Sequence, residues 1–204
     1  MNNDIDYLID QKISGRTLIF DLDNTLYNEF DFLKQQYFLV SRFFCPDEIE
    51  IAYDYLVSTF LSEGRGSLFN KFQEHFNLEY DISSVLECFR TYSSDNLGSL
   101  KCYAWFLDLL KHYDGDESLI IITNGNVLQQ QEKIKRLNLN EIYGNTVVIY
   151  ANDHSPKPDR SSYDFLSNCQ LLNKPIYIGD SIVDFNFSKN CDLEYFDVNR
   201  LNLN

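Results

Sequence analysis

Acidic, hydroxyl and amide side chains follow three strand-like segments of the sequence. The first segment ends in Asp21-Leu22-Asp23-Asn24-Thr25, the second in Thr123-Asn124-Gly125, and a later one in Gly179-Asp180-Ser181, with Asp184 one helical turn further on. Lys157-Pro158 precedes this last segment. Each group alone is also typical of a turn or a cap. Together they bring carboxylates, a hydroxyl and one lysine to positions where a structural role does not require them.

The carboxylates are candidates for binding a cation. Like charges at neighbouring strand ends repel each other unless a cation lies among them. Oxygen donors with no nearby Cys or His favour Mg²⁺, so the sequence predicts a magnesium site. Asp21 and Asp23 would point to opposite faces of a continuing strand, but a turn just past its end can direct both toward one cavity. One carboxylate would then act as a nucleophile and the other would carry protons.

Five short segments rich in apolar and aromatic residues predict the strands that position these groups. Their near-continuous apolar content, with helix-like stretches between the last four, is typical of a parallel sheet covered on both faces. We therefore expect an α/β, doubly wound fold, in which reactive groups gather beyond the carboxyl ends of the strands. The predicted strands are Thr17–Asp23, Leu119–Asn124, Thr146–Ala151, Pro175–Asp180 and Leu193–Val198.

The long interval between the first two strands predicts an inserted module. Apolar residues recur there at helical spacing in four stretches, which predicts four amphipathic helices. Pro46-Asp47-Glu48 suits a helix start, and Gly64-Arg65-Gly66 suits a break between helices. We expect residues 26–98 to form a helical cap, hinged near Leu26–Phe30 and Leu97–Ser99. Residues 1–25 and 99–204 then form the core, and the chain re-enters this core as a helix at about 101–113.

Composition excludes several classes of partner. The formal net charge of −14, without a dense run of Lys or Arg, argues against non-specific nucleic-acid binding. The N-terminal residues are polar and acidic, and no stretch approaches the length of a membrane span. The five scattered cysteines are typical of reduced, mostly buried side chains. We therefore expect a cytoplasmic protein without a nucleic-acid or membrane partner.

The motifs and their order resemble the haloacid dehalogenase-like hydrolase superfamily. The resemblance rests on Asp21-x-Asp23-x-Thr25, Thr123-Asn124-Gly125, Lys157-Pro158 and Gly179-Asp180-x-x-x-Asp184, and it covers nearly the whole chain. It implies the fold of that superfamily, with a helical cap inserted after the first motif.

The resemblance also implies a role for each motif residue. Asp21 resembles the nucleophile that forms an aspartyl-phosphate, and Asp23 the general acid/base. Thr123 and the amide of Asn124 resemble a phosphate clamp, and Lys157 a charge-neutralising lysine. The implied magnesium ligands are the carboxylates of Asp21 and Asp180 and the backbone carbonyl of Asp23. Asp184 and Thr25 are expected to contact the reacting residues rather than the substrate. Asp184 would orient Lys157 or a metal-bound water. The alternative interpretation of Asp184 is a helix cap.

Arg65 is a candidate for substrate recognition. The turn Gly64-Arg65-Gly66-Ser67-Leu68 resembles the substrate-contacting cap turn of sugar-phosphate mutases and phosphatases in the superfamily. Arg65 could therefore hold a distal anionic group, although a solvated arginine near a helix end is an equal interpretation.

These residues favour a magnesium-dependent phosphatase acting on a small phosphorylated metabolite, as a monomer or a homodimer. Dehalogenases of the superfamily lack the acid/base carboxylate at the position of Asp23, and phosphonate hydrolases use a cap lysine. A phosphomutase is the first alternative, and a non-catalytic binding or regulatory module the second. The sequence does not identify the phosphate ester.

Overall fold

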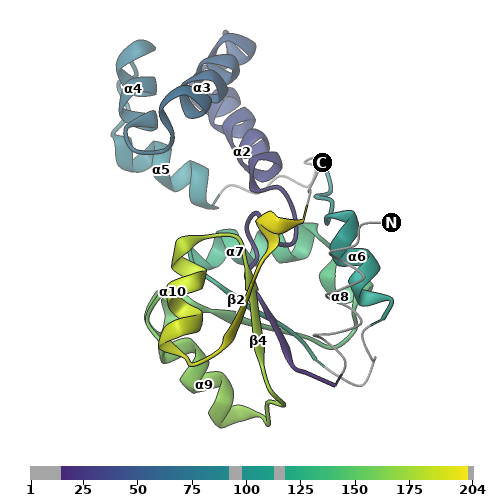
Figure 1. The fold of residues 1–204 in the computed structure, drawn as a ribbon. Helices are drawn as coiled ribbons and strands as arrows, with labels where there is room; N and C mark the ends of the chain where they lie inside the picture. Colours follow the sequence, from purple (N-terminus) through teal and green to yellow (C-terminus); the bar gives the residue numbers. More distant parts are fainter. Residues whose placement is uncertain (1–14, 92–97, 113–117, 202–204) are drawn as a thin grey trace. The chain divides into compact units, whose positions relative to one another are not determined.

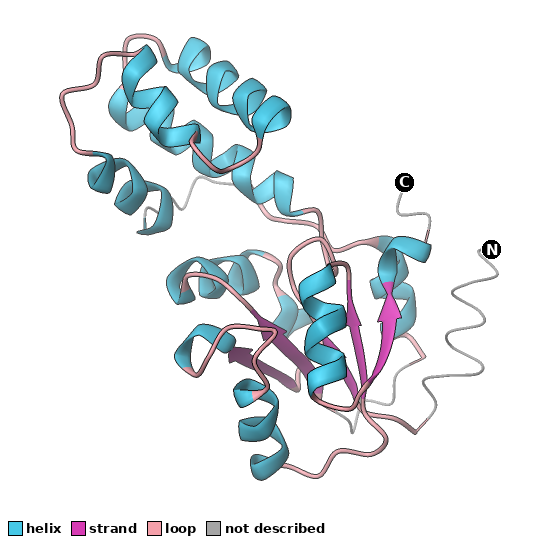
Figure 2. Cartoon of the chain, turned by 60° about the vertical axis from the view of Figure 1, so that its left-hand side comes forward, coloured by secondary structure: helices cyan, strands magenta, loops and turns pink. Residues whose placement is uncertain are grey.

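The computed structural model describes residues 15–91, 98–112 and 118–201. The chain divides into two compact units (Figures 1 and 2). The first unit contains the chain up to Glu29 and from Ser99 onward, and the second contains Phe30–Gly98. One of the two expected hinge segments begins at Leu97, which lies outside the described residues.

The first unit is built on a five-stranded parallel sheet with the order β3-β2-β1-β4-β5. The central strand β1 is the first in sequence, and it pairs with β2 on one side and β4 on the other. All five strands lie within the segments predicted from the sequence. Their bounds are β1 Leu18–Phe20, β2 Leu119–Thr123, β3 Thr146–Tyr150, β4 Ile176–Gly179 and β5 Glu194–Asp197.

Helices cover both faces of the sheet, which confirms the doubly wound α/β fold. Ile19 belongs to a buried cluster with Leu166 of α9 (Ser161–Cys169) and Phe187 of α10 (Ile182–Asn190). The next residue, Phe20, points to the opposite face, where its ring packs edge-on against Phe106 of α6 (Ala104–Leu110). Successive strand residues alternate between faces, so β1 is buried from both sides.

The other described elements of this unit follow the strands. After β2 come α7 (Val127–Arg136) and the short α8 (Leu139–Ile142). Two 3₁₀ turns, η2 (Ala151–Asp153) and η3 (Val198–Arg200), follow β3 and β5. The helix expected at about 101–113 is α6, and Tyr113 lies outside the described residues.

The described residues of the second unit form four helices, at the places where the sequence predicts them. They are α2 (Glu29–Phe44), α3 (Ile49–Glu63), α4 (Leu68–His75) and α5 (Ile82–Thr91). An aromatic cluster holds them together: the buried ring of Tyr37 in α2 contacts Phe60 of α3, Phe69 of α4 and Phe89 of α5. A single residue of α2 therefore connects all four helices.

The segment before α2 packs with the sheet unit. Leu26 and Tyr27 are fully buried, and the backbone N–H of Tyr103 donates to the carbonyl of Leu26 at 2.8 Å. The division between units accordingly falls after Glu29, four residues beyond Thr25.

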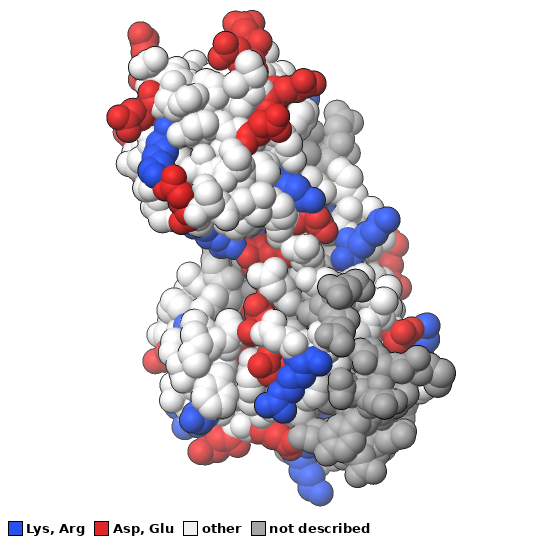
Figure 3. Space-filling view, turned by 45° about the horizontal axis from the view of Figure 1, so that its top comes forward, with Lys and Arg blue, Asp and Glu red and all other residues white. Residues whose placement is uncertain are grey.

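Charged side chains of both signs are mixed on the face of the molecule that Figure 3 shows. Figure 3 shows Asp and Glu scattered over the described part of one face, with Lys and Arg among them rather than gathered into a basic surface. Within the described residues, no helix combines the length and the apolar character needed to cross a membrane.

Candidate active site

Asp21 and Lys157 form a buried ion pair at the carboxyl end of the sheet. Asp21 directly follows β1, and its backbone N–H donates to the carbonyl of Ile178 in β4 at 2.8 Å. Lys157 Nζ lies 2.6 Å from Asp21 Oδ1, and the two side chains are 2% and 10% exposed. Burial by itself lowers the pKa of the Lys157 ammonium, but the charges and hydrogen bonds of Asp21 and Asp184 outweigh it and raise the pKa.

Asp184 shares the same lysine and also begins a helix. Its Oδ1 accepts from Lys157 Nζ at 2.7 Å and from the hydroxyl of Tyr177 at 3.2 Å. Its Oδ2 accepts from the backbone N–H and the hydroxyl of Ser181, while the Ser181 Oγ accepts from the Asp184 N–H, which is the capping box of α10. Both expected roles of Asp184, supporting Lys157 and capping a helix, therefore belong to one side chain.

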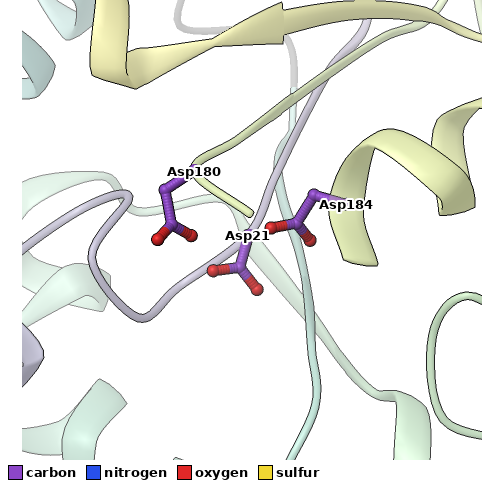
Figure 4. Close-up of side chains that lie close together, drawn as sticks. All are labelled: Asp21, Asp180 and Asp184. Atoms are coloured by element: carbon purple, nitrogen blue, oxygen red, sulfur yellow. The ribbon is translucent and has the colours of Figure 1, made fainter. Parts of the chain in front are cut away.

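Three carboxylates converge at this point. Asp21, Asp180 and Asp184 each have an oxygen within 4.8 Å of the others, and their side chains point toward a common space (Figure 4). They come from the ends of two adjacent strands and from the first turn of α10. Each is an oxygen donor, which is the type that Mg²⁺ prefers.

Burial disfavours the ionised forms of these carboxylates. It raises the pKa of Asp21 to about 7, with Lys157 opposing the shift and Asp184 adding to it. Burial and the charge of Asp184 also raise the pKa of Asp180, to about 6. A divalent cation among the three oxygens would favour their ionised forms, so the donor set fits Mg²⁺.

Gly179 makes room for Asp184. A Cβ atom built on Gly179 would lie 2.7 Å from two side-chain carbons of Asp184, closer than non-bonded carbons approach. The last residue of β4 must therefore lack a side chain for the capping carboxylate to reach the cluster.

Asp23 lies in a separate network. Both of its carboxylate oxygens face Lys133 Nζ of α7, at 2.8 and 2.6 Å. The hydroxyl of Tyr27 donates to Oδ1 at 2.6 Å, and Gln130 Nε2 donates to Oδ2 at 3.4 Å. The two expected reacting carboxylates thus pair with different lysines, Asp21 with Lys157 and Asp23 with Lys133.

The segment after β2 supports both networks. The Asn124 side chain forms two hydrogen bonds with the backbone of Lys157, and the hydroxyl of Thr123 donates to Gln130 Oε1 at 3.4 Å. Gly125 has φ of 126°, and a Cβ there would meet Gln130 Nε2. The predicted phosphate clamp therefore lies beside both lysine-bearing segments.

Two other predicted residues lie at different places. Thr25 is fully buried, and its hydroxyl is 3.5 Å from Asp180 Oδ1, which is consistent with a supporting position. Arg65 is an exposed residue of the second unit, in the turn between α3 and α4.

Sequence reasoning missed Tyr177, Lys133 and Gln130. The Tyr177 hydroxyl accepts from Lys157 Nζ at 2.8 Å, yet in sequence Tyr177 is one aromatic residue of an apolar strand. Lys133 and Gln130 occur in a polar helix whose last turn also holds Lys135 and Arg136. The one available signal was spacing, because Gln130 and Lys133 are three residues apart and so share a face of α7.

Comparison with known proteins identifies the family of this chain. The model of the haloacid dehalogenase-like hydrolase family matches residues 18–198. The chain therefore belongs to the haloacid dehalogenase-like hydrolases, a superfamily of enzymes. None of the curated protein sequences matches the chain significantly.

Solved structures with the same fold have diverse activities. One is a Thermotoga maritima protein described as a β-phosphoglucomutase, at 16% identity and TM-score 0.61 over 89% of this chain and 84% of the other. Another is the HAD-hydrolase YfnB from Bacillus subtilis bound to magnesium, at 17% identity and TM-score 0.57 over 88% and 86%. A third is L-2-haloacid dehalogenase from Xanthobacter autotrophicus, at 16% identity and TM-score 0.51 over 91% and 78%. At these identities the likeness establishes the fold and leaves the reaction open.

Proposed function

We propose that this hydrolase is a magnesium-dependent phosphatase of small phosphate monoesters, with Asp21 as nucleophile. The observation that carries the proposal is the buried Asp21 carboxylate, held by Lys157 beside Asp180 and Asp184. A buried lysine among carboxylates supplies the positive charge that an incoming phosphoryl group needs.

The proposed reaction has two halves. In the first, Asp21 bonds to phosphorus, the bond to the ester oxygen breaks, and the proton of Asp23 passes to that oxygen. In the second, water bonds to phosphorus, Asp23 takes its proton, and Asp21 leaves as a carboxylate while phosphate is released. Protons balance because Asp23 regains in the second half what it gave in the first.

The residues proposed to hold magnesium are Asp21, Asp180 and the backbone carbonyl of Asp23, and the proximity of Asp184 lets it support them. When bound, the ion would neutralise negative charge on the phosphoryl group and the carboxylates. In this proposal Lys157 orients Asp21, Asn124 holds the Lys157 backbone, and the buried Thr123, whose hydroxyl donates to Gln130, would turn toward the phosphate when the substrate binds.

Asp23 supports phosphatase activity over dehalogenation. The first half-reaction expels an alkoxide or phenoxide, which benefits from a proton, whereas a departing halide needs none. A carboxylate two residues after the nucleophile therefore suits an ester substrate. We also propose that residues 30–98 act as the substrate-selecting cap.

The test is hydrolysis of para-nitrophenyl phosphate by the purified full chain. We expect turnover with Mg²⁺, none after chelation, and none from Asp21→Asn, with Asp54→Asn on the exposed side of α3 as the matched control. Turnover by Asp21→Asn, or undiminished turnover after chelation, would overturn the proposal. A panel of phosphorylated metabolites, scored for free phosphate and for isomerised product, then separates a phosphatase from a mutase.

A further inference from the structure

Lys133 is a buried cation that the proposed reaction does not yet use. Its side chain is 4% exposed, although it lies in a helix turn with an exposed lysine, Lys135, two residues later. A lysine is rarely buried unless its charge is paired. Here the partner is Asp23, and a second carboxylate, Glu29, lies 3.6 Å from Nζ.

The ion pair has an inner and an outer member. The Asp23 side chain is 19% exposed, and the Lys133 side chain behind it is 4% exposed. A substrate arriving from solvent can therefore reach the carboxylate of Asp23 more readily than the ammonium of Lys133. Any effect of Lys133 on the reaction should pass through Asp23.

The carboxylate is held in one orientation. Lys133 Nζ contacts both of its oxygens, and the fully buried Tyr27 donates a hydrogen bond of 2.6 Å to one of them. Gln130 reaches the other oxygen at 3.4 Å and accepts from Thr123. Rotation of the Asp23 side chain would break several of these contacts together, so the network fixes the direction of its lone pairs.

We propose that Lys133 is a positioning residue that orients Asp23 for proton transfer. This inference rests on the proposed role of Asp23 as the general acid/base. When Asp23 gives its proton to the leaving oxygen, negative charge develops on a carboxylate that already faces an ammonium group. Proton transfer requires the donor and acceptor within hydrogen-bond reach, which depends on a fixed carboxylate.

The test compares two aryl phosphates of nearly the same shape. Phenyl phosphate has a poor leaving group that needs a proton, whereas para-nitrophenyl phosphate has a good one that needs little help. We expect Lys133→Met to lower kcat for phenyl phosphate by about 10–100-fold, as for a residue that orients a reacting group, with KM nearly unchanged. The loss on para-nitrophenyl phosphate should be several-fold smaller. Lys135→Met, on the exposed side of the same helix, should leave both rates unchanged.

A double variant separates positioning from a structural role. If Lys133 acts through Asp23, adding Lys133→Met to Asp23→Asn should cost no further activity on either substrate. This variant removes both charges of the Asp23–Lys133 ion pair and leaves the Glu29 carboxylate. Its comparison with Asp23→Asn remains informative if Lys133→Met alone unfolds, and thermal unfolding reports whether each variant folds.

The outcomes distinguish this inference from the proposed function. Equal losses on the two substrates, a faster Lys133→Met enzyme, or a further loss in the double variant would overturn the positioning role. Each of these requires an active parent enzyme and an inactive Asp21→Asn. An inactive parent, or an active Asp21→Asn, would instead overturn the proposed phosphatase.

Discussion

Asn124 and Lys157 hold each other through two hydrogen bonds. The Lys157 backbone N–H donates to Asn124 Oδ1 at 2.8 Å, and Asn124 Nδ2 donates to the Lys157 carbonyl at 3.0 Å. The end of β2 is thereby fastened to the segment that carries the buried lysine. The Asn124 side chain thus controls the backbone from which Lys157 extends to Asp21.

Asn124→Ala should lower kcat through displacement of Lys157. Both hydrogen bonds are lost, and a shift of the lysine backbone moves Nζ away from Asp21, which can cost about 10²-fold in rate. Steady-state kinetics on para-nitrophenyl phosphate measures this. Asn140→Ala, on the exposed side of α8, is the control and should match the parent. A parental rate for Asn124→Ala would show that the pair does not position Lys157.

Gly179→Ala should disturb the carboxylate cluster. The added methyl group would lie 2.7 Å from the Asp184 side chain, so Asp184 must move away from Lys157 and Ser181. We expect a loss of about 1–3 kcal/mol in the free energy of unfolding, as for other overpacked sites, and weaker Mg²⁺ binding. Denaturant unfolding and magnesium titration measure the two effects.

Gly144→Ala provides the control for this substitution. A Cβ at Gly144 meets no atom within 4 Å. It should leave magnesium binding unchanged. If Gly179→Ala bound magnesium as the parent does, the close approach of Gly179 and Asp184 would not matter to the cluster.

Magnesium-free protein should become less stable as the pH rises from about 4 to 7. Burial raises the pKa of Asp21 to about 7, above the 3.8 of an unperturbed Asp. A folded state that holds the proton more tightly than the unfolded state is favoured below the unfolded pKa, and this advantage disappears as the pH passes the folded pKa. Asp180, with a pKa raised to about 6, acts in the same direction.

Asp21→Asn should remove most of this pH dependence. It should also raise the melting temperature of the magnesium-free protein at pH 8, where the parent carries an ionised buried Asp21. Thermal unfolding of both proteins across this range, in chelator, measures the difference. Equal slopes for the two would contradict the assignment to Asp21.

Arg65→Ala should separate generic from natural substrates. If Arg65 holds a distal phosphate or carboxylate of the substrate, its loss raises KM for that substrate by about tenfold or more, the effect of losing a charge-assisted hydrogen bond. Hydrolysis of para-nitrophenyl phosphate, which has no such group, should be nearly unchanged. Equal effects on the two substrates would favour the interpretation of Arg65 as a solvated surface residue without a role in substrate recognition.

The sheet could be predicted because its strands are uninterrupted apolar segments. Ile176–Gly179 and Leu119–Thr123 show no alternation of apolar and polar residues, as expected for strands buried on both faces. The polar residues that directly follow these strands indicated where the site lies. The four helices of residues 29–91 could be predicted from the helical spacing of their apolar residues, because each helix buries one face. The local pattern of apolar residues was therefore sufficient to predict each strand and helix that is buried along its whole length.

Individual contacts could not be predicted. Lys133 and Lys135 are the same residue type in the same helix, and only packing against the core buries the first and leaves the second in water. Lys157 contacts both Asp21, which follows β1, and the hydroxyl of Tyr177 in β4, and these two groups lie together because β4 pairs with β1 in space. Such pairings join residues far apart in the chain, and sequence spacing carries no record of them.

The central place of β1 has a consequence for biosynthesis. Of the five strands of this sheet, β1 is the first in chain order, whereas its neighbours β2 and β4 begin only at Leu119 and Ile176. Lys157 follows Asp21 by 136 residues in the chain and Asp180 follows later still, so Asp21 is synthesised well before either of them. A chain still being synthesised therefore contains Asp21 without Lys157, Asp180 and Asp184, so the proposed chemistry requires the sheet to assemble around β1.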